Sequence, residues 1–76
     1  MDKKQLDKRI LKIAERLKEL RIENGYTSYE QFAFDNDIPR VQYWRLETGT
    51  NFTINTLLKV LDAHQISLSD FFKGLQ

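Results

Sequence analysis

The first third of the chain places apolar residues at intervals of three and four, with charged residues between them. This spacing is typical of one apolar face on an α-helix. The polar positions hold Lys, Arg, Glu and Gln, which all favour helix. Asn24-Gly25 follows, and glycine readily adopts the left-handed conformation that ends a helix. The pattern predicts a helix from about Lys3 to Asn24, with an apolar face made of Leu6, Ile10, Ile13, Ala14, Leu17 and Leu20.

Start and stop signals predict four shorter helices in the rest of the chain. Ser28, Thr53 and Ser67 have side chains suited to N-caps, and Gln31 would complete a capping box with Ser28. Pro39 suits the first position of a helix. The four helices are expected over residues 29–36, 39–48, 54–64 and 68–73.

The same periodicity predicts which side chains form the core. We expect Val60 at its margin and either Phe71 or Phe72 inside it. The inward positions expected in the second, third and fourth helices and the turn at residues 36–38 are Phe32, Ala33, Ile38, Tyr43, Leu46, Ile54, Leu57, Leu58 and Leu61. The sequence therefore predicts an all-α fold of five helices in one domain.

Composition narrows the class of protein further. The chain of 76 residues has no cysteine, which excludes disulfides and thiolate metal sites, and His64 is its single histidine. No stretch approaches the roughly 20 apolar residues that cross a bilayer, and the charged N-terminus is unlike a signal peptide. We therefore expect a soluble cytoplasmic protein without a metal or other cofactor. His64 is expected to be a structural residue placed favourably at a helix C-terminus.

Charge is distributed unevenly although the net charge is only +1. Residues 1–24 carry eight Lys or Arg against five Asp or Glu, whereas residues 25–46 carry two Arg against three acidic residues. A broad basic surface is therefore not available in the middle of the chain. Any surface for nucleic acid there has to be built from a few placed cations.

Two of the predicted helices have the arrangement of a helix-turn-helix. The helices over 29–36 and 39–48 are short and are joined by a tight turn at residues 36–38. The small Ala33 would allow the two helices to approach closely, and Ile38 would anchor the turn. In this motif the second helix enters the major groove of DNA while the first crosses the backbone.

The stretch from Ser28 to Gly49 resembles the phage-repressor, or Cro/cI-type, helix-turn-helix family, also called the xenobiotic-response-element family. The resemblance covers about residues 13–73, with residues 1–12 as an N-terminal extension of the first helix. It implies a five-helix lambda-repressor-like DNA-binding domain. The residues that carry it are Leu17 to Arg21, Gly25, Ser28, Phe32-Ala33, Asn36 to Ile38, Glu47-x-Gly49, Leu57 to Leu61 and Ile66 to Phe72.

The chain departs from the family pattern at several positions, and one extra residue precedes Ser28. Asp37 and Gln65 stand where the family usually has glycine. Asn36 replaces an apolar residue, and His64 replaces a leucine. Tyr29 replaces a glutamine that often touches phosphate at the start of the second helix.

The third predicted helix carries the candidate base-reading residues. Arg can donate two hydrogen bonds to guanine, and Gln can pair with adenine. Trp44 points outward as part of an interaction surface, or is partly buried against the second helix. The expected DNA contacts on this helix are Arg40, Val41, Gln42, Trp44 and Arg45.

Two flanking segments complete the candidate surface. Ser28 and Tyr29 begin the second helix, at the position where the family touches phosphate. Thr48, Thr50 and Asn51 follow the third helix, where they either hold a phosphate or are ordinary solvated loop residues.

The resemblance implies an ion pair between Arg21 and Glu47 that ties the first helix to the third. The alternative is that Arg21 faces a phosphate of the DNA. The ion pair is favoured, because Glu47 would otherwise be an unpaired carboxylate close to DNA and repelled by it.

These patterns favour a sequence-specific DNA-binding protein that acts as a transcriptional repressor or regulator. We expect a homodimer on a two-fold site, formed through terminal helices that present Leu6 and Ile10. The alternative is a protein-interaction or antitoxin-like module that keeps the fold and binds DNA weakly. An enzyme is not expected, because the sequence shows no nucleophile–base pair and no set of metal ligands. No small-molecule ligand is evident.

Overall fold

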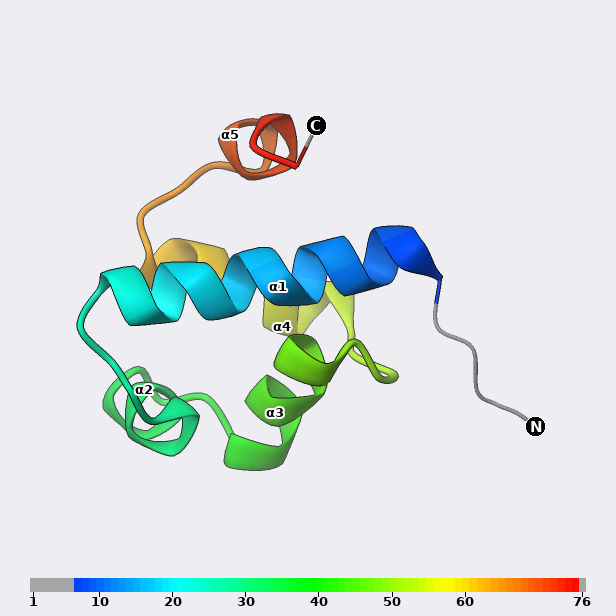
Figure 1. Ribbon diagram of the computed structural model, residues 1–76. Helices are drawn as coiled ribbons and strands as arrows, with labels where there is room; N and C mark the ends of the chain where they lie inside the picture. The colour runs from blue at the N-terminus through cyan, green and yellow to red at the C-terminus, as the bar shows by residue number, and fades with distance from the viewer. Residues whose placement is uncertain (1–6, 76) are drawn as a thin grey trace.

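The computed structural model describes residues 7–75, and all regular secondary structure within that range is helical. Figure 1 shows α1 crossing the middle of the molecule, with α2 and α3 on one side of it and α5 on the other. Over residues 7–75, no helix combines the length and the apolar character needed to cross a membrane. The five helices are α1 (Lys8–Glu23), α2 (Tyr29–Asp35), α3 (Arg40–Thr48), α4 (Ile54–Ala63) and α5 (Leu68–Lys73).

The first helix begins later than its apolar pattern indicates. Asp7 has an extended backbone and is the N-cap of α1, its carboxylate accepting a hydrogen bond from the backbone N–H of Arg9 at 2.8 Å. Hydrogen bonds from Arg9 lower the pKa of Asp7 to about 2. The predicted inclusion of Asp7 in the helix is therefore wrong. The predicted start at Lys3 and the apolar Leu6 lie outside the described residues.

The N-caps of three later helices are the residues that the sequence predicts. Ser28, Thr53 and Ser67 each accept a hydrogen bond from the backbone N–H three residues on, at 3.2, 3.1 and 3.0 Å. The capping box at Ser28 is only half formed, because the Gln31 side chain donates to Asp35 instead. Pro39 occupies the N-cap position of α3 rather than its first helical position.

Three predicted helix ends are one residue too long, because Asn24, Asn36 and His64 are the C-caps of α1, α2 and α4. After the caps of α2 and α4 one residue has a positive φ, +58° at Asp37 and +56° at Gln65. The next N–H then bonds back into the helix, from Ile38 to the Ala33 carbonyl at 2.9 Å and from Ile66 to the Leu61 carbonyl at 3.0 Å. Both ends are therefore Schellman motifs built without glycine.

The core forms around α3, which packs against α1, α2 and α4. The predicted Ala33 and Ile38 are buried between the short helices, and Phe71, not Phe72, enters the core from α5. The largest fully buried side chains are Leu17, Phe32, Tyr43, Leu46, Leu57, Val60, Leu61 and Phe71.

The orientation of α4 differs from the sequence prediction. Val60, expected at the margin, is fully buried, whereas Ile54 is 64% exposed and Leu58 is also exposed. The buried face of α4 includes the polar Thr56 beside Leu57, Val60 and Leu61. The buried face of α4 is therefore turned away from the face that the apolar pattern predicts. Thr56 takes one of the inward positions, and Ile54 and Leu58 lie outside.

Candidate nucleic-acid interface

Two short consecutive helices, α2 and α3, form the candidate interface. Residues 36–39 connect them, and the Asn36 side chain donates to the Phe32 carbonyl at 2.8 Å, which closes the end of α2. On the inward side of α3, Tyr43 and Leu46 are fully buried. The inner face of α3 is thereby fixed to the core, and its other face is left toward solvent.

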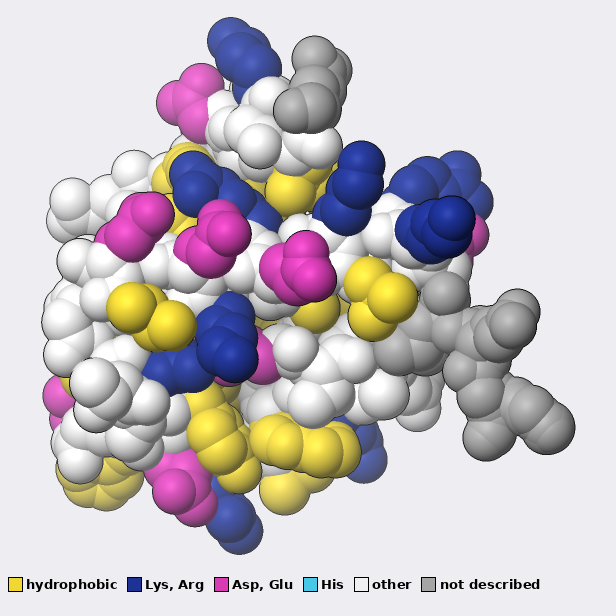
Figure 2. All heavy atoms as spheres, in the orientation of Figure 1, with side chains coloured by type: hydrophobic (Ala, Val, Ile, Leu, Met, Phe, Trp, Pro, Cys, Tyr) yellow, Lys and Arg dark blue, Asp and Glu magenta, His cyan; other side chains and the backbone are white. Residues whose placement is uncertain are grey.

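All five side chains expected to contact DNA from α3 are exposed. Val41 is 50% exposed and Trp44 is 44% exposed, which are high fractions for large apolar side chains. Figure 2 shows apolar side chains gathered over α2 and α3 on the lower part of the molecule, with charged side chains next to them. Trp44 is therefore open to solvent over nearly half of its surface, in keeping with an outward position.

The two arginines of α3 differ in their surroundings. Arg40 forms an ion pair with Glu30 of α2, with 3.3 Å between its Nη1 and the Glu30 Oε2, and both side chains are largely exposed. Arg45, one turn further along, has no ion-pair partner within the described part of the chain. Within residues 7–75, Arg40 is therefore the arginine of the two whose charge is partly offset, by Glu30.

Gln42 is tied to the start of α4. Its Oε1 lies 3.4 Å from the hydroxyl of Thr56, and that hydroxyl lies 3.0 Å from the Thr53 hydroxyl. Thr56 is buried, whereas Gln42 is exposed. A polar chain of three side chains therefore runs from the N-cap of α4 to the outer face of α3.

The flanking residues expected to hold phosphate make mostly local contacts. The Ser28 hydroxyl caps α2, and Tyr29 is half-buried against the core. The Thr48 hydroxyl lies 3.0 Å from the Trp44 carbonyl and 2.9 Å from the Thr50 hydroxyl. Asn51 is exposed, with a φ of +45°. These residues lie at the ends of α2 and α3, on either side of the exposed face of α3.

Arg21 and Glu47 form the ion pair that the resemblance implies. Nε and Nη2 of Arg21 donate to the two carboxylate oxygens of Glu47 at 2.7 and 3.2 Å, and its Nη1 donates to the Tyr26 carbonyl. The hydroxyl of Tyr43 also donates to Glu47. Burial and this hydrogen bond raise the pKa of Tyr43, and the bond to Glu47 raises that of Arg21. Arg21 is 5% exposed, so it does not face a phosphate.

His64 is a structural residue, as the sequence predicts, but its ring favours the neutral form. The ring stacks on Phe32 with 4.9 Å between centroids, and its Nδ1 accepts a hydrogen bond from the Asn24 side chain. Burial lowers the pKa of His64, partly opposed by Glu23. A protonated His64 interacting with the helix dipole is therefore disfavoured.

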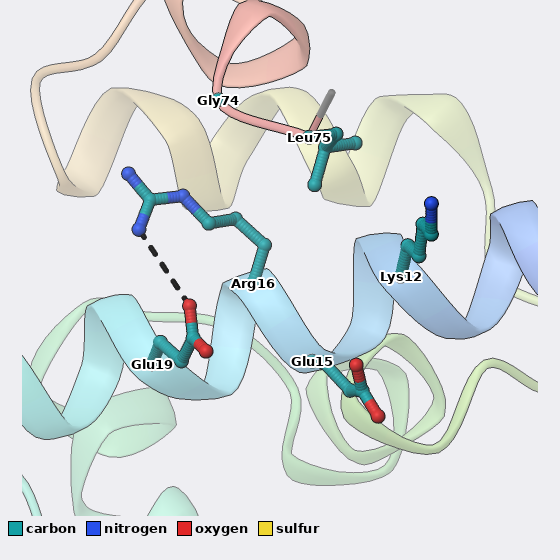
Figure 3. A pocket seen from close by; sticks show the side chains of 6 residues that line it. All are labelled: Lys12, Glu15, Arg16, Glu19, Gly74 and Leu75. Carbon is teal, nitrogen blue, oxygen red and sulfur yellow. Dashed lines mark ion pairs between the residues drawn. The ribbon is translucent and has the colours of Figure 1, made fainter.

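A hollow away from this surface lies between α1 and the end of α5 (Figure 3). Side chains of both charges line it, and Arg16 approaches Glu19 at 3.7 Å. Residues 7–75 contain no group of three or more His, Asp or Glu side chains placed to hold a metal ion. This hollow is therefore less suited to a single class of charged ligand than the surface of α3.

Three features of the site were not predicted from the sequence: the Glu30–Arg40 ion pair, the Thr56–Gln42 contact and the Tyr43–Glu47 hydrogen bond. Only the Tyr43–Glu47 hydrogen bond had a signal in the sequence, because residues four apart on a helix lie on the same face. The other two join separate helices.

Comparison with known proteins does not assign the chain to a family. No protein-family model, no curated protein and no solved structure matches it. The case for a function therefore rests on the residues of the site and on the helices that position them.

Proposed function

We propose that this chain binds duplex DNA in a sequence-specific manner and acts as a transcriptional repressor or regulator. In this proposal α2 and α3 are a Cro/cI-type helix-turn-helix within a lambda-repressor-like domain, and α3 lies in the major groove. The observation that carries the proposal is the division of α3 into two faces. Tyr43, Leu46 and Glu47 hold its inner face, while its outer face presents cations, an amide and apolar side chains.

The chemistry of the outer face suits base edges. Arg40, Val41 and Gln42 lie in the first turn of α3, the part of a recognition helix that meets the bases. Arg45 follows Val41 one turn later on the same side and can donate two hydrogen bonds to guanine. The exposed Val41 and Trp44 can contact the methyl group of thymine.

Phosphate contacts would come from the two ends of this surface. Ser28 is the N-cap of α2 and Tyr29 is its first residue, where the helix N-terminus favours an anion. Thr48, Thr50 and Asn51 follow α3 with short polar side chains and backbone N–H groups. Such contacts fix the position of a protein on the duplex without reading its sequence.

The proposal includes a homodimer on a two-fold site, because one domain of this size offers few base contacts. Leu6 lies outside the described residues, but Ile10 is half-buried. Ile10 lines an apolar groove of about 470 Å³ together with Ile54 and Phe72, which are both exposed. A second copy of the chain packing through the terminal helices would cover these side chains.

A second candidate function is a protein-interaction or antitoxin-like module. The observation that favours it is the Glu30–Arg40 ion pair, which reduces the positive charge available to DNA. Val41 and Trp44 would then serve as apolar anchors for a protein partner.

The test begins with selection of bound duplexes from a random pool. Arg40→Ala and Arg45→Ala should each weaken binding to the selected site by about 1–3 kcal/mol where the arginine reads a base. Where the arginine only neutralises a phosphate, the affinity for all duplexes should fall equally. The slope of log affinity against log salt concentration should then fall in magnitude by about one. Titrations of matched and scrambled duplexes at two salt concentrations distinguish these outcomes.

If both variants bind every duplex as the parent does, the protein-interaction module becomes the better account. Sedimentation of the same samples at high concentration should show a dimer. Monomer alone, with and without DNA, would contradict the proposed self-association.

A further inference from the structure

The face of α1 that points away from the core has a regular order of side chains. Its central line, which we call the outer stripe, consists of Leu11, Glu15, Lys18 and Ile22, and all four are exposed. Because they are separated by three or four residues, they lie along one side of the helix. Leu11 and Ile22 are 39% and 52% exposed although both are large and apolar. Figure 2 shows apolar, acidic and basic side chains intermixed along the course that α1 takes in Figure 1.

The outer stripe is self-complementary. Its spacing is that of helices that pack side by side in coiled coils. The two apolar residues lie equally far from the middle of the stripe, and so do the two charged ones. An antiparallel second copy of α1, related by a two-fold axis, would therefore place its Ile22 against Leu11. It would also place its Lys18 against Glu15, and neither of these charged residues forms an ion pair within residues 7–75.

The charges beside the stripe favour the same orientation. Lys8 and Lys12 are exposed on the N-terminal half of α1. Glu19 and Glu23 are exposed on its C-terminal half. An antiparallel pair brings each basic half beside an acidic half, whereas a parallel pair would oppose like charges. Arg16 approaches Glu19 only to 3.7 Å and leaves the Glu19 side chain 64% exposed, so Glu19 stays accessible to a partner.

We infer that the outer stripe of α1 is a self-association surface, and that its partner is α1 of a second copy of this chain packed antiparallel. The surface is separate from the groove at Ile10 and Phe72, because Ile10 belongs to the inward stripe of α1. It contains no residue of α3, so the inference does not depend on DNA binding. A single pair of helices covers less area than a typical stable interface, so the association should be weak and should weaken further as salt is added.

The first test uses two charge-reversed chains in the absence of DNA. Glu15→Lys makes both central positions of the stripe basic, and Lys18→Glu makes both acidic. Each chain alone opposes like charges, so its association constant should be about tenfold below that of the parent. An equal mixture of the two chains should recover the association, because each copy then meets the opposite charge. Sedimentation equilibrium at low salt compares the parent, the two variants and the mixture.

The second test fixes the orientation. The chain has no cysteine, so one introduced cysteine reports one contact. When Leu11→Cys and Ile22→Cys chains are mixed and oxidised, the disulfide should form mainly between unlike chains, since the antiparallel pair places these two positions opposite each other. Both substitutions are at exposed positions, as are the two charge reversals, so the fold should be retained.

Two results would overturn the inference. One is a mixture that associates no more strongly than each charge-reversed chain alone, as expected if copies pair only through the groove at Ile10 and Phe72. The other is a disulfide that forms mainly between identical chains, as a parallel pair requires. Association through the groove adds equally to every sample, so it does not obscure the comparison. If a charge-reversed chain fails to fold, the disulfide test decides alone.

Discussion

At the scale of single residues, the surface of α3 is shaped by side chains of neighbouring helices. Glu30 of α2 lies against Arg40, and Thr56 of α4 lies against Gln42. Both contacts act on candidate DNA-binding residues without belonging to α3. The properties of the surface therefore depend on residues that would not touch the DNA themselves.

Glu30→Gln should strengthen binding to all duplexes alike. The substitution removes a carboxylate that pairs with Arg40 at 3.3 Å and that would repel nearby phosphates. Because the pair is exposed and screened by salt, the gain should be only a few-fold and should shrink as salt is added. Titration of a scrambled duplex at two salt concentrations measures it.

The matched control is Glu30→Gln in an Arg40→Ala background, where the gain should be smaller because no arginine is released. If Glu30→Gln alone binds scrambled DNA at low salt with the same affinity as the parent, Glu30 does not restrain Arg40.

At the scale of helices, the ends determine how α2 meets α3 and how α4 meets α5. Gly25 and Gly49, both with positive φ, follow α1 and α3, whereas Asp37 and Gln65 take the equivalent conformation after α2 and α4. A left-handed conformation costs a side-chain-bearing residue roughly 1–2 kcal/mol, and Asp tolerates it better than most residues.

Gln65→Gly should therefore raise the free energy of unfolding by about 1 kcal/mol, and Asp37→Gly should raise it by less. The reason is that glycine removes the steric cost at a φ of +56° or +58° but makes the unfolded chain more flexible. Urea unfolding of the two variants and the parent gives the comparison. Destabilisation by Gln65→Gly would indicate that the Gln65 side chain contributes more than its backbone conformation costs.

The helix boundaries could be predicted from the sequence where a local side chain sets them. Ser28, Thr53 and Ser67 were visible as N-caps because each bonds to an N–H three residues away. The rotation of α4 was not predictable, because it depends on how a buried Thr56 meets α3 rather than on the apolar pattern of α4 itself.

At the scale of the whole molecule, His64 links three helices. It caps α4, stacks on Phe32 of α2 and accepts a hydrogen bond from Asn24 at the end of α1. Since the Asn24 Nδ2 is a donor, Nδ1 of His64 carries no proton and the hydrogen of the neutral ring is on Nε2. That Nε2 is buried without a hydrogen-bond partner within the described residues. A second proton would therefore be placed against the amide of Asn24.

The free energy of unfolding should fall as the pH is lowered from about 7.5 to about 5.5. The pKa of His64 lies below its ordinary value of 6.5 in the folded chain, so the unfolded chain binds the proton first. The part of the free energy of unfolding that comes from neutral His64 is present above pH 6.5. It is lost as the pH falls toward the pKa that His64 has in the folded chain. Urea unfolding across this range measures the slope.

His64→Leu is the matched variant, because leucine fills the space without titrating. Its free energy of unfolding should be nearly independent of pH over the same interval. A slope equal to that of the parent would assign the pH dependence to other groups.

The candidate surface could be predicted in part, because the outward positions of α3 follow from its helical period once Tyr43 and Leu46 are placed inward. The contacts that each outward side chain makes could not be predicted from the sequence. Whether Arg40 is paired and what Gln42 contacts depend on side chains 10 and 14 residues away, brought close only by helix packing.

The two faces of α3 also separate two kinds of evolutionary pressure. Tyr43 and Leu46 are in the core, whereas Arg40 and Arg45 lie outside it. Substitutions at exposed positions typically change the free energy of unfolding by no more than about 0.5 kcal/mol. A few outward mutations can therefore change the chemistry of this face without producing variants that fail to fold.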